Sequence, residues 1–347
     1  MNISKNMKNL ILSLIILLMI SSCSVENNYT EKSVSTVVIF SDEEKGQMKL
    51  YKIQIDGENI KEISFPDLPK EAEVEYYAWS SKNNKWFLSL TNNEGNEIYS
   101  LDADGRNLQR ITHLPEIKKS QIVPSPSGKF IAFIGFSKGT DIFIVKLQNN
   151  EVIHLPFNNS NENAIGWTKD SQHVIFRSDL NGLPNIFMID NNGENLKNLS
   201  NGPGVDGIFD ISNQNNKIVF ESDRDGKSDL FVTEIGDINY TNVTSNPSRD
   251  ISPLWSPNDE YILFKSDRDG GEDLYLLDLE NNNVSRLTFT PEIGELNPLW
   301  CPNSECILFN ANQEGNQDIF KVTIDGELTN LTKSEANEIS PQWWSYD

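Results

Sequence analysis

The chain has few of the side chains from which metal centres and nucleophilic catalytic sites are usually built. Its 347 residues include three histidines and three cysteines. The histidines, His113, His154 and His173, occupy different positions of the internal repeat, so nothing in the sequence brings them to one point. A zinc site normally gathers three or four Cys, His or carboxylate ligands. We therefore expect no enzyme activity and no resident cofactor.

Positive charge is also scarce. The sequence has 29 Lys and Arg against 51 Asp and Glu, which gives a formal net charge of −22. Such a surface repels nucleic acid and anionic lipid headgroups, and it attracts cations and basic protein surfaces. No nucleic-acid partner is expected. Acidity also keeps an extracytoplasmic protein in solution.

Only one apolar run is long, and it lies at the N-terminus. Leu10 to Ile20 follows Lys5 and Lys8 and is too short to span a bilayer, as is typical of a signal peptide. The run ends Ile20-Ser21-Ser22-Cys23, which resembles a bacterial lipobox. We predict a signal peptide at 1–22, a lipidated Cys23, a flexible tether at 23–36 and one folded domain at 37–347.

The lipid on Cys23 predicts a protein held in the cell envelope. The expected place is the periplasmic face of the outer membrane or the cell surface. Cys301 and Cys306 then lie in an oxidising compartment and flank the turn Pro302-Asn303-Ser304-Glu305. A disulfide across this turn and two separate thiols are both compatible with the spacing.

A sequence pattern that recurs about every 45 residues extends over the rest of the chain. An aromatic residue closes a short apolar run at seven places, which are Phe40, Phe87, Phe133, Phe176, Phe220, Phe264 and Phe309. The two clearest units, at 216–234 and 260–278, read as strand, Ser-Asp-Arg-Asp-Gly turn and strand. Asp and Ser side chains bond a turn backbone and Gly accepts positive φ, so each unit predicts a β-hairpin.

Two further strands complete each unit. One precedes the hairpin and often carries a tryptophan, as at Trp167, Trp255 and Trp300, and the other follows and ends in Leu-Thr or a similar pair. The first unit lacks its leading strand, and the C-terminal segment 338–344 supplies a matching one. This pattern predicts an all-β fold, a seven-bladed β-propeller of four-stranded antiparallel blades whose first blade is closed by the C-terminal strand.

The units resemble the WD-like repeats of the TolB β-propeller. The matching residues are Trp255-Ser256-Pro257-Asn258, the turn from Ser266 to Gly270, and Asp273-Leu274-Tyr275. The resemblance covers roughly 37–347 and implies the propeller fold. TolB propellers have six blades, whereas the repeats here count to seven.

Gly135-Phe136-Ser137-Lys138-Gly139 fits the Gly-x-Ser-x-Gly pattern of hydrolases, which requires a strand-to-helix turn. In the repeat this segment lies at the hairpin turn, so we interpret it as turn chemistry.

One repeated position carries acids without an evident structural reason. It lies five residues before the tryptophan position and holds Glu162, Asp206, Asp250, Glu295 and Glu338. The leading strand of a propeller blade is innermost, so these carboxylates are expected near one mouth of the channel, where they could hold a cation such as Ca²⁺ or receive a basic segment. The sequence equally allows a solvated loop.

The functional prediction is a monomeric, membrane-anchored extracytoplasmic scaffold that binds an envelope protein or peptide. The acidity of the chain favours a basic partner. The alternatives are a carbohydrate-binding or polysaccharide-lyase-like propeller, and a propeller accessory to a peptidase.

Overall fold

The structure of the chain, a computed structural model, describes residues 36–42, 48–137, 139–157, 160–214, 216–237, 239–289, 296–313, 315–333 and 337–344. Within these ranges every regular element is a β-strand. No helix there has the length and apolarity needed to cross a membrane. The signal peptide, Cys23 and the tether up to residue 35 lie outside the described residues and stay predictions.

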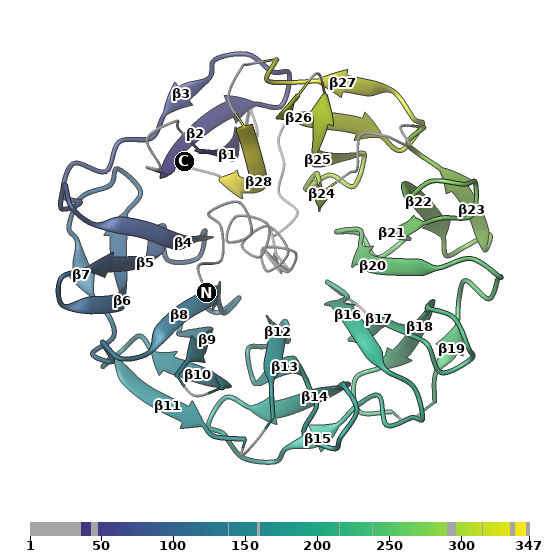
Figure 1. Cartoon of the computed structure of the whole chain (residues 1–347), viewed down its shortest axis with the longest axis horizontal. Coiled ribbons are helices and arrows are strands. Elements are labelled where there is room, and N and C mark those ends of the chain that lie inside the picture. Colours follow the sequence, from purple (N-terminus) through teal and green to yellow (C-terminus); the bar gives the residue numbers. More distant parts are fainter. Residues whose placement is uncertain are drawn as a thin grey trace, which may run out of the picture.

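The described strands pair into seven four-stranded antiparallel sheets, arranged as a ring around a centre (Figure 1). Six sheets are each formed by four strands that follow one another in the chain. These blades are β4 (Glu73–Ser80), β5 (Lys85–Asn92), β6 (Gly95–Asp102), β7 (Gln109–Arg110); β8 (Lys118–Pro124), β9 (Phe130–Phe136), β10 (Thr140–Lys146), β11 (Glu151–Leu155); β12 (Glu162–Trp167), β13 (His173–Ser178), β14 (Asn185–Asp190), β15 (Lys197–Asn198); β16 (Asp206–Ile211), β17 (Lys217–Ser222), β18 (Asp229–Glu234), β19 (Thr241–Asn242); β20 (Asp250–Trp255), β21 (Tyr261–Ser266), β22 (Asp273–Asp278), β23 (Asn283–Arg286); and β24 (Leu296–Trp300), β25 (Cys306–Gln313), β26 (Asn316–Thr323), β27 (Leu328–Asn330).

The prediction of a seven-bladed propeller is wrong in its count, because only six of the described sheets are blades of consecutive strands. The remaining sheet is the one that the C-terminal strand was predicted to close. It is a composite, in which β28 (Asn337–Trp344) pairs with β1 (Thr36–Asp42), followed by β2 (Met48–Gln54) and β3 (Lys61–Glu62). The propeller thus has six continuous blades and one composite closing sheet. The physical reason is that the first repeat supplies only three strands, so its sheet is completed by a strand about 300 residues away in the chain.

Tryptophans of three innermost strands join their sheet to the one before it. Trp167 in β12 donates from Nε1 to the carbonyl of Val123 in β8 at 2.9 Å, and Trp300 in β24 donates to Leu254 in β20 at 3.3 Å. Trp343 in β28 donates to the carbonyl of Trp300 at 2.5 Å. The repeated tryptophan is therefore an inter-blade contact and not a surface feature.

The innermost strand of each described sheet carries a register shift where it pairs with the second strand. Such β-bulges bend a strand and raise its twist. In five sheets the bulge contains a non-glycine residue with φ near +50°, namely Gln121, Ala164, Ser252, Asn297 and Ser340. The preceding sheet supports two of them, because Glu221 accepts from the Ser252 amide at 3.0 Å and Asn310 from the Ser340 amide at 3.4 Å.

The hydrophobic core lies between neighbouring sheets rather than in one central mass. One cluster joins Ile134 and Ile144 of the β8–β11 blade to Trp167 and Phe176 of the β12–β15 blade. All four side chains are at most 1% exposed. Each blade consequently depends on its neighbours for the burial of one face.

Candidate functional site

The predicted acidic position lies at the start of the innermost strands. Glu162, Asp206 and Asp250 are the first residues of β12, β16 and β20, and Glu338 is the second residue of β28. Glu295 lies outside the described residues. Glu162, Asp206 and Asp250 each pair in register with the serine that ends the second strand, Ser178, Ser222 and Ser266 respectively.

In the β16–β19 blade the carboxylate is buried and neutralised within the blade. Asp206 is 0% exposed, and its Oδ1 accepts from the Arg224 guanidinium at 2.8 Å. Its Oδ2 accepts from the Ser200 hydroxyl at 2.5 Å. The Arg224 guanidinium carbon lies 5.1 Å from the ring centre of Phe220, 4.9 Å from Phe231 and 4.5 Å from Tyr240. Arg224 is the arginine of the Ser-Asp-Arg-Asp-Gly turn.

The β20–β23 blade repeats this arrangement. Asp250 is 0% exposed, and the Arg268 guanidinium donates to both of its carboxylate oxygens at 3.0 Å. Arg268 lies over the rings of Phe264 and Tyr275 at 5.2 and 4.9 Å. These two carboxylates hold an arginine of their own blade, so they do not form an open acidic mouth.

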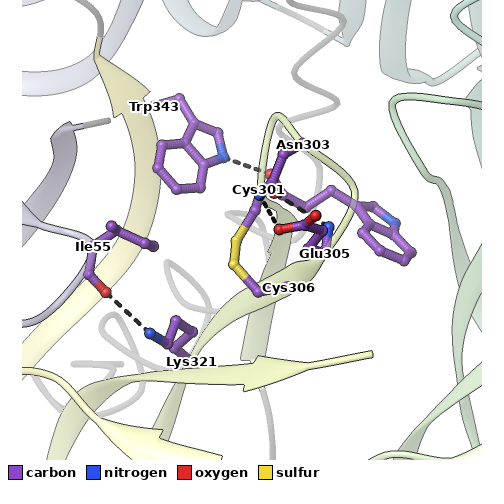
Figure 2. The surroundings of a disulfide bond; sticks show 8 residues. Ile55, Cys301, Asn303, Glu305, Cys306, Lys321 and Trp343 are labelled. Atoms are coloured by element: carbon purple, nitrogen blue, oxygen red, sulfur yellow. Dashed lines mark hydrogen bonds between the residues drawn. A yellow bond between two sulfur atoms is a disulfide. The ribbon is translucent and has the colours of Figure 1, made fainter. Parts of the chain in front are cut away.

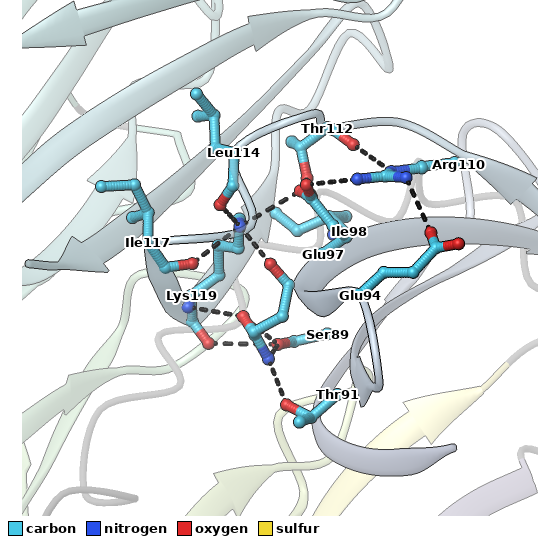
Figure 3. Close-up of polar contacts among 11 residues, drawn as sticks. Ser89, Thr91, Glu94, Glu97, Ile98, Arg110, Thr112, Leu114, Ile117 and Lys119 are labelled. Carbon is cyan, nitrogen blue, oxygen red and sulfur yellow. Dashed lines mark hydrogen bonds and ion pairs between the residues drawn. The ribbon is translucent and has the colours of Figure 1, made fainter. Parts of the chain in front are cut away.

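In the β8–β11 blade the same position carries Lys119, which is completely buried (Figure 3). Its ammonium donates to the backbone carbonyls of Asn96, Leu114 and Ile117 and lies 3.1 Å from the Glu97 carboxylate. Burial lowers the pKa of Lys119. The lysine therefore joins its blade to the preceding one.

Glu97 is the carboxylate at the centre of this network. It also receives the Thr112 hydroxyl and, at 2.7 Å, the Arg110 guanidinium. Burial raises the pKa of Glu97, but the hydrogen bonds from Thr112, Arg110 and Lys119 outweigh it and leave the pKa below its usual value. Glu97 is therefore held as a carboxylate inside the protein.

Glu162 in the β12–β15 blade differs from Asp206 and Asp250, and it shares with Glu338 a buried carboxylate oxygen that has no hydrogen-bond partner. It is 1% exposed, and its Oε1 accepts from the hydroxyls of Ser160 at 2.6 Å and Ser178 at 2.8 Å. Its Oε2 is buried and has no hydrogen-bond partner. Burial raises the pKa of Glu162, and the nearby charges of Asp141 and Asp179 act in the same direction. Among the described residues of its blade, no Lys or Arg forms an ion pair or hydrogen bond with this carboxylate.

Glu162 lacks an arginine partner because one residue differs in the turn between the second and third strands. The turns at 178–182, 222–226 and 266–270 have equivalent backbones, since the glycine amide bonds the aspartate carbonyl in each, at 2.8, 2.8 and 3.1 Å. The third residue is Arg224 or Arg268 in two of them and Leu180 in the β12–β15 blade. This pairing was not predicted from the sequence. A signal was present, because the acid and the arginine lie 18 residues apart in both the β16–β19 and the β20–β23 blade.

His154 in β11 and His173 in β13 each lie beside a different aspartate and share no site. His154 Nε2 lies 2.9 Å from the Asp141 carboxylate, and His173 Nε2 lies 3.3 Å from that of Asp190. Within the described ranges no group of three or more His, Cys, Asp and Glu side chains could hold a metal ion. The Ca²⁺ hypothesis gains no support from these residues.

The Gly-x-Ser-x-Gly segment is a hairpin turn. Gly135 and Phe136 end β9 and pair with Asp141 and Thr140 of β10. The Ser137 amide donates to the Gly139 carbonyl at 3.1 Å, and Lys138 lies outside the described residues. A strand-to-strand turn lacks the helix that a nucleophile elbow requires.

Cys301 and Cys306 form a disulfide across the turn between β24 and β25 (Figure 2). In four other blades a hydroxyl stands at the first of these positions and accepts from the backbone amide at the second, as Ser256 does from Tyr261 at 2.9 Å. The disulfide thus occupies the place of a repeated hydrogen bond. It packs with Ile53 and Trp343 at the junction with the composite sheet.

Comparisons with known proteins agree with this architecture. The family model described as TolB beta propeller domain matches residues 196–345, and the model described as eukaryotic translation initiation factor eIF2A matches residues 30–180. No curated protein sequence matches the chain.

Solved structures with the same fold come from several classes of protein. TolB from Acinetobacter baumannii superimposes with a TM-score of 0.55 at 15% identity, over 95% of this chain and 93% of that one. An oligogalacturonate lyase from Vibrio parahaemolyticus gives 0.61 at 10% identity, over 87% and 86%. A puromycin-hydrolysing peptidase from Mycobacterium tuberculosis gives 0.63 at 10% identity, over 92% of this chain and 54% of that one.

A ring of four-stranded antiparallel sheets, each with its first strand innermost, defines the class of β-propellers. Within that class the repeats and the matching family model make this chain a TolB-like β-propeller. These solved structures, a TolB, a lyase and a peptidase, are only 10–15% identical to the chain, so they define the fold and assign no reaction.

Proposed function

We propose that this protein is a non-catalytic scaffold of the cell envelope, anchored by lipid on Cys23, that binds a basic protein or peptide on one face of its propeller. This face is the one where the innermost strands begin, and it is named the loop face below. The proposal extends the TolB-like fold to a binding role, which one fold alone cannot specify.

The composition of the loop face carries the proposal. It combines exposed apolar side chains with exposed acids. Leu183, Val205 and Phe289 are 43%, 38% and 69% exposed there. The turns between second and third strands add the exposed carboxylates of Asp223 and Asp267. Protein interfaces typically join an apolar centre to a charged rim, and a rim of acids selects a basic partner.

The rigid ring favours binding without large rearrangement. The loops of this face are tied to their own blades, because the amides of Asn161, Val205 and Arg249 donate to Asp179, Asp223 and Asp267 at 2.7, 2.6 and 2.9 Å. A surface held in this way loses little conformational entropy when a partner docks.

Site-directed photo-crosslinking in the native cells tests the proposal. A photoreactive residue at Val205 should capture one specific protein. The matched control is Leu328, which is 44% exposed and begins β27 at the end of another blade that lies opposite the loop face. Equal capture from both positions, or capture from neither, would contradict a binding role for the loop face.

The anchor has its own test. Cys23→Ala should release the protein from the membrane fraction into the soluble fraction. Retention of the variant in detergent-dependent fractions would contradict lipid anchoring.

A further inference from the structure

The β12–β15 blade shares with the buried arginine sites of its neighbours a carboxylate opposite a serine, the turn and a pair of aromatic rings, but its turn carries no arginine. The register of carboxylate and serine is the same, with Glu162 opposite Ser178 as Asp206 is opposite Ser222. The turn that would carry the arginine has the same backbone hydrogen bonds. The amide of its third residue also bonds the preceding serine hydroxyl in each blade, at 3.1 Å for Leu180, 3.4 Å for Arg224 and 3.3 Å for Arg268.

The aromatic surface on which the neighbouring arginines lie is also present. Phe176 and Phe187 occupy the positions of Phe220 and Phe231, with ring centres 5.8 Å apart. A third ring comes from the preceding blade, where Phe157 stacks on Phe176 at 5.2 Å, whereas the third ring of the next blade, Tyr240, belongs to that blade and meets Phe220 edge-on. Leu180 packs on this cluster and is only half-buried. Aromatic faces attract guanidinium groups once the pair is shielded from water.

The carboxylate itself is left incompletely satisfied. In the neighbouring blades the serine hydroxyl accepts from the arginine Nε, at 2.9 Å for Ser222 and 3.0 Å for Ser266. In this blade the Ser178 hydroxyl instead turns to Glu162 Oε1, and Oε2 stays buried without a hydrogen-bond partner. A buried carboxylate oxygen without a donor is unfavourable, and a guanidinium is the donor that matches it best.

We propose that the β12–β15 blade is a receptor site for an arginine side chain of a partner protein. Glu162 binds the guanidinium as Asp206 and Asp250 bind Arg224 and Arg268, and Leu180 moves aside to admit it. This inference rests on the proposed function, since it identifies the point at which the loop face recognises a basic partner. Leu183 and Val205 lie beside the site, because the Asp206 amide donates to the Pro184 carbonyl at 2.9 Å and brings the two loops together.

An arginine supplied by the chain itself provides the sharpest test. Leu180→Arg rebuilds the arrangement of the neighbouring blades, so it should fill the site and exclude an external arginine. Leu183→Arg adds the same charge three residues away without filling it. Glu162→Gln keeps the shape of the acid and removes its charge.

The probe is acetyl-Gly-Arg-Gly-amide, titrated at millimolar concentration and followed by the NMR amide resonances of residues 176–182. The wild type and Leu183→Arg should show saturable shifts at these residues. Leu180→Arg and Glu162→Gln should each weaken binding at least about tenfold, and the citrulline peptide, which lacks the charge, should not bind to the wild type. Unchanged affinity in Leu180→Arg or in Glu162→Gln, or equal binding of the citrulline peptide, overturns the proposal.

Crosslinking of the partner to the variants tests this inference separately from the proposed function. Crosslinking from Val205 should be lost in Leu180→Arg and kept in Leu183→Arg. If the partner is captured equally by the wild type, Leu180→Arg and Glu162→Gln, the arginine site fails and the scaffold role stands. If the wild type captures no partner, the scaffold role itself fails.

Discussion

At the scale of the residue, one backbone position in this ring has three electrostatic solutions. It holds an aspartate neutralised by an arginine in two blades, a lysine buried against Glu97 in another, and an incompletely satisfied glutamate in a fourth. The backbone is the same in each case, so the fold does not fix the charge. Whether such a buried ionisable group is neutralised within the blade or can bind an external ligand depends on the charged side chains that contact it.

Asp210 makes a prediction about pH. It is buried in β16, accepts from the Trp255 amide at 2.7 Å, and burial raises its pKa from 3.8 to about 7. The native state therefore holds this proton more tightly than the unfolded chain. The contribution of Asp210 to stability is greatest below pH 4 and is lost as pH rises through about 7.

Replacing Asp210 by asparagine should remove this pH-dependent loss of stability. In Asp210→Asn the unfolding free energy should exceed that of the wild type at pH 8 by roughly 1 to 4 kcal/mol, and the difference should shrink toward pH 4. Urea unfolding across this pH range measures it. Asp104→Asn, at an exposed position, is the control. A constant difference between Asp210→Asn and the wild type at all pH values would contradict the assignment.

Two adjacent lysines allow buried and exposed ion pairs to be compared directly. Lys119→Met removes a buried charge that donates to three carbonyls and is one of three donors to Glu97, so it should cost about 3–5 kcal/mol. Lys118 pairs with Glu75 at 2.8 Å but is 55% exposed, so Lys118→Met should cost at most about 1 kcal/mol. Denaturant unfolding provides both values, and similar losses in the two variants would argue against a structural role for Lys119.

At the scale of the element, the turn between the first two strands of a blade is closed in two chemically different ways. A hydroxyl accepts from the backbone in several blades, as at Ser125, Thr168, Ser212 and Ser256, and a disulfide replaces this bond between Cys301 and Cys306. The second position also carries an aromatic in two blades, and Tyr261 stacks on Trp300 of the next sheet at 6.4 Å.

The repeat therefore suggests a replacement for the disulfide. Cys301→Ala with Cys306→Ala should lose about 2 kcal/mol, as expected for closing so short a loop. Cys301→Ser with Cys306→Tyr restores the hydroxyl contact and places a ring toward Trp343, so it should lose less. Thermal unfolding of both variants under non-reducing conditions measures the difference, and equal midpoints would show that the two closures are not interchangeable.

The strands were predictable from the sequence because each repeat carries its own turn residues and apolar run. The pairing of Asp206 and Asp250 with arginine was not predictable in the same way. It depends on the arginine of a turn 18 residues away and on where its guanidinium lies. The prediction that these acids line the mouth of the channel rested only on their position in the innermost strand. The burial that makes Asp206 and Asp250 structural becomes visible only when the turn is folded over them.

At the scale of the whole molecule, stability depends on how the ring closes. The pairing of β1 with β28 joins the two ends of the ring, and Trp344 packs at 5.5 Å from Trp86 of the neighbouring blade. Without β28, β1 would become an open sheet edge and a large aromatic cluster would face water.

Truncation tests this dependence. A chain that ends at residue 336 should lose cooperative unfolding and bind a hydrophobic dye, because closure is lost while the hairpins remain. A synthetic peptide of residues 337–347 added in trans should restore cooperativity, whereas a scrambled peptide should not. An unchanged thermal midpoint in the truncated chain would show that the six continuous blades are stable by themselves.

The composite sheet also determines how the molecule responds to tension. β1 lies between β2 and β28, so it is held by hydrogen-bond ladders on both sides. A pull applied at Thr36 along the strand loads both ladders in shear at once, whereas a pull on an edge strand would peel one ladder bond by bond. The propeller is therefore mechanically strongest at the end of the domain that the predicted tether joins.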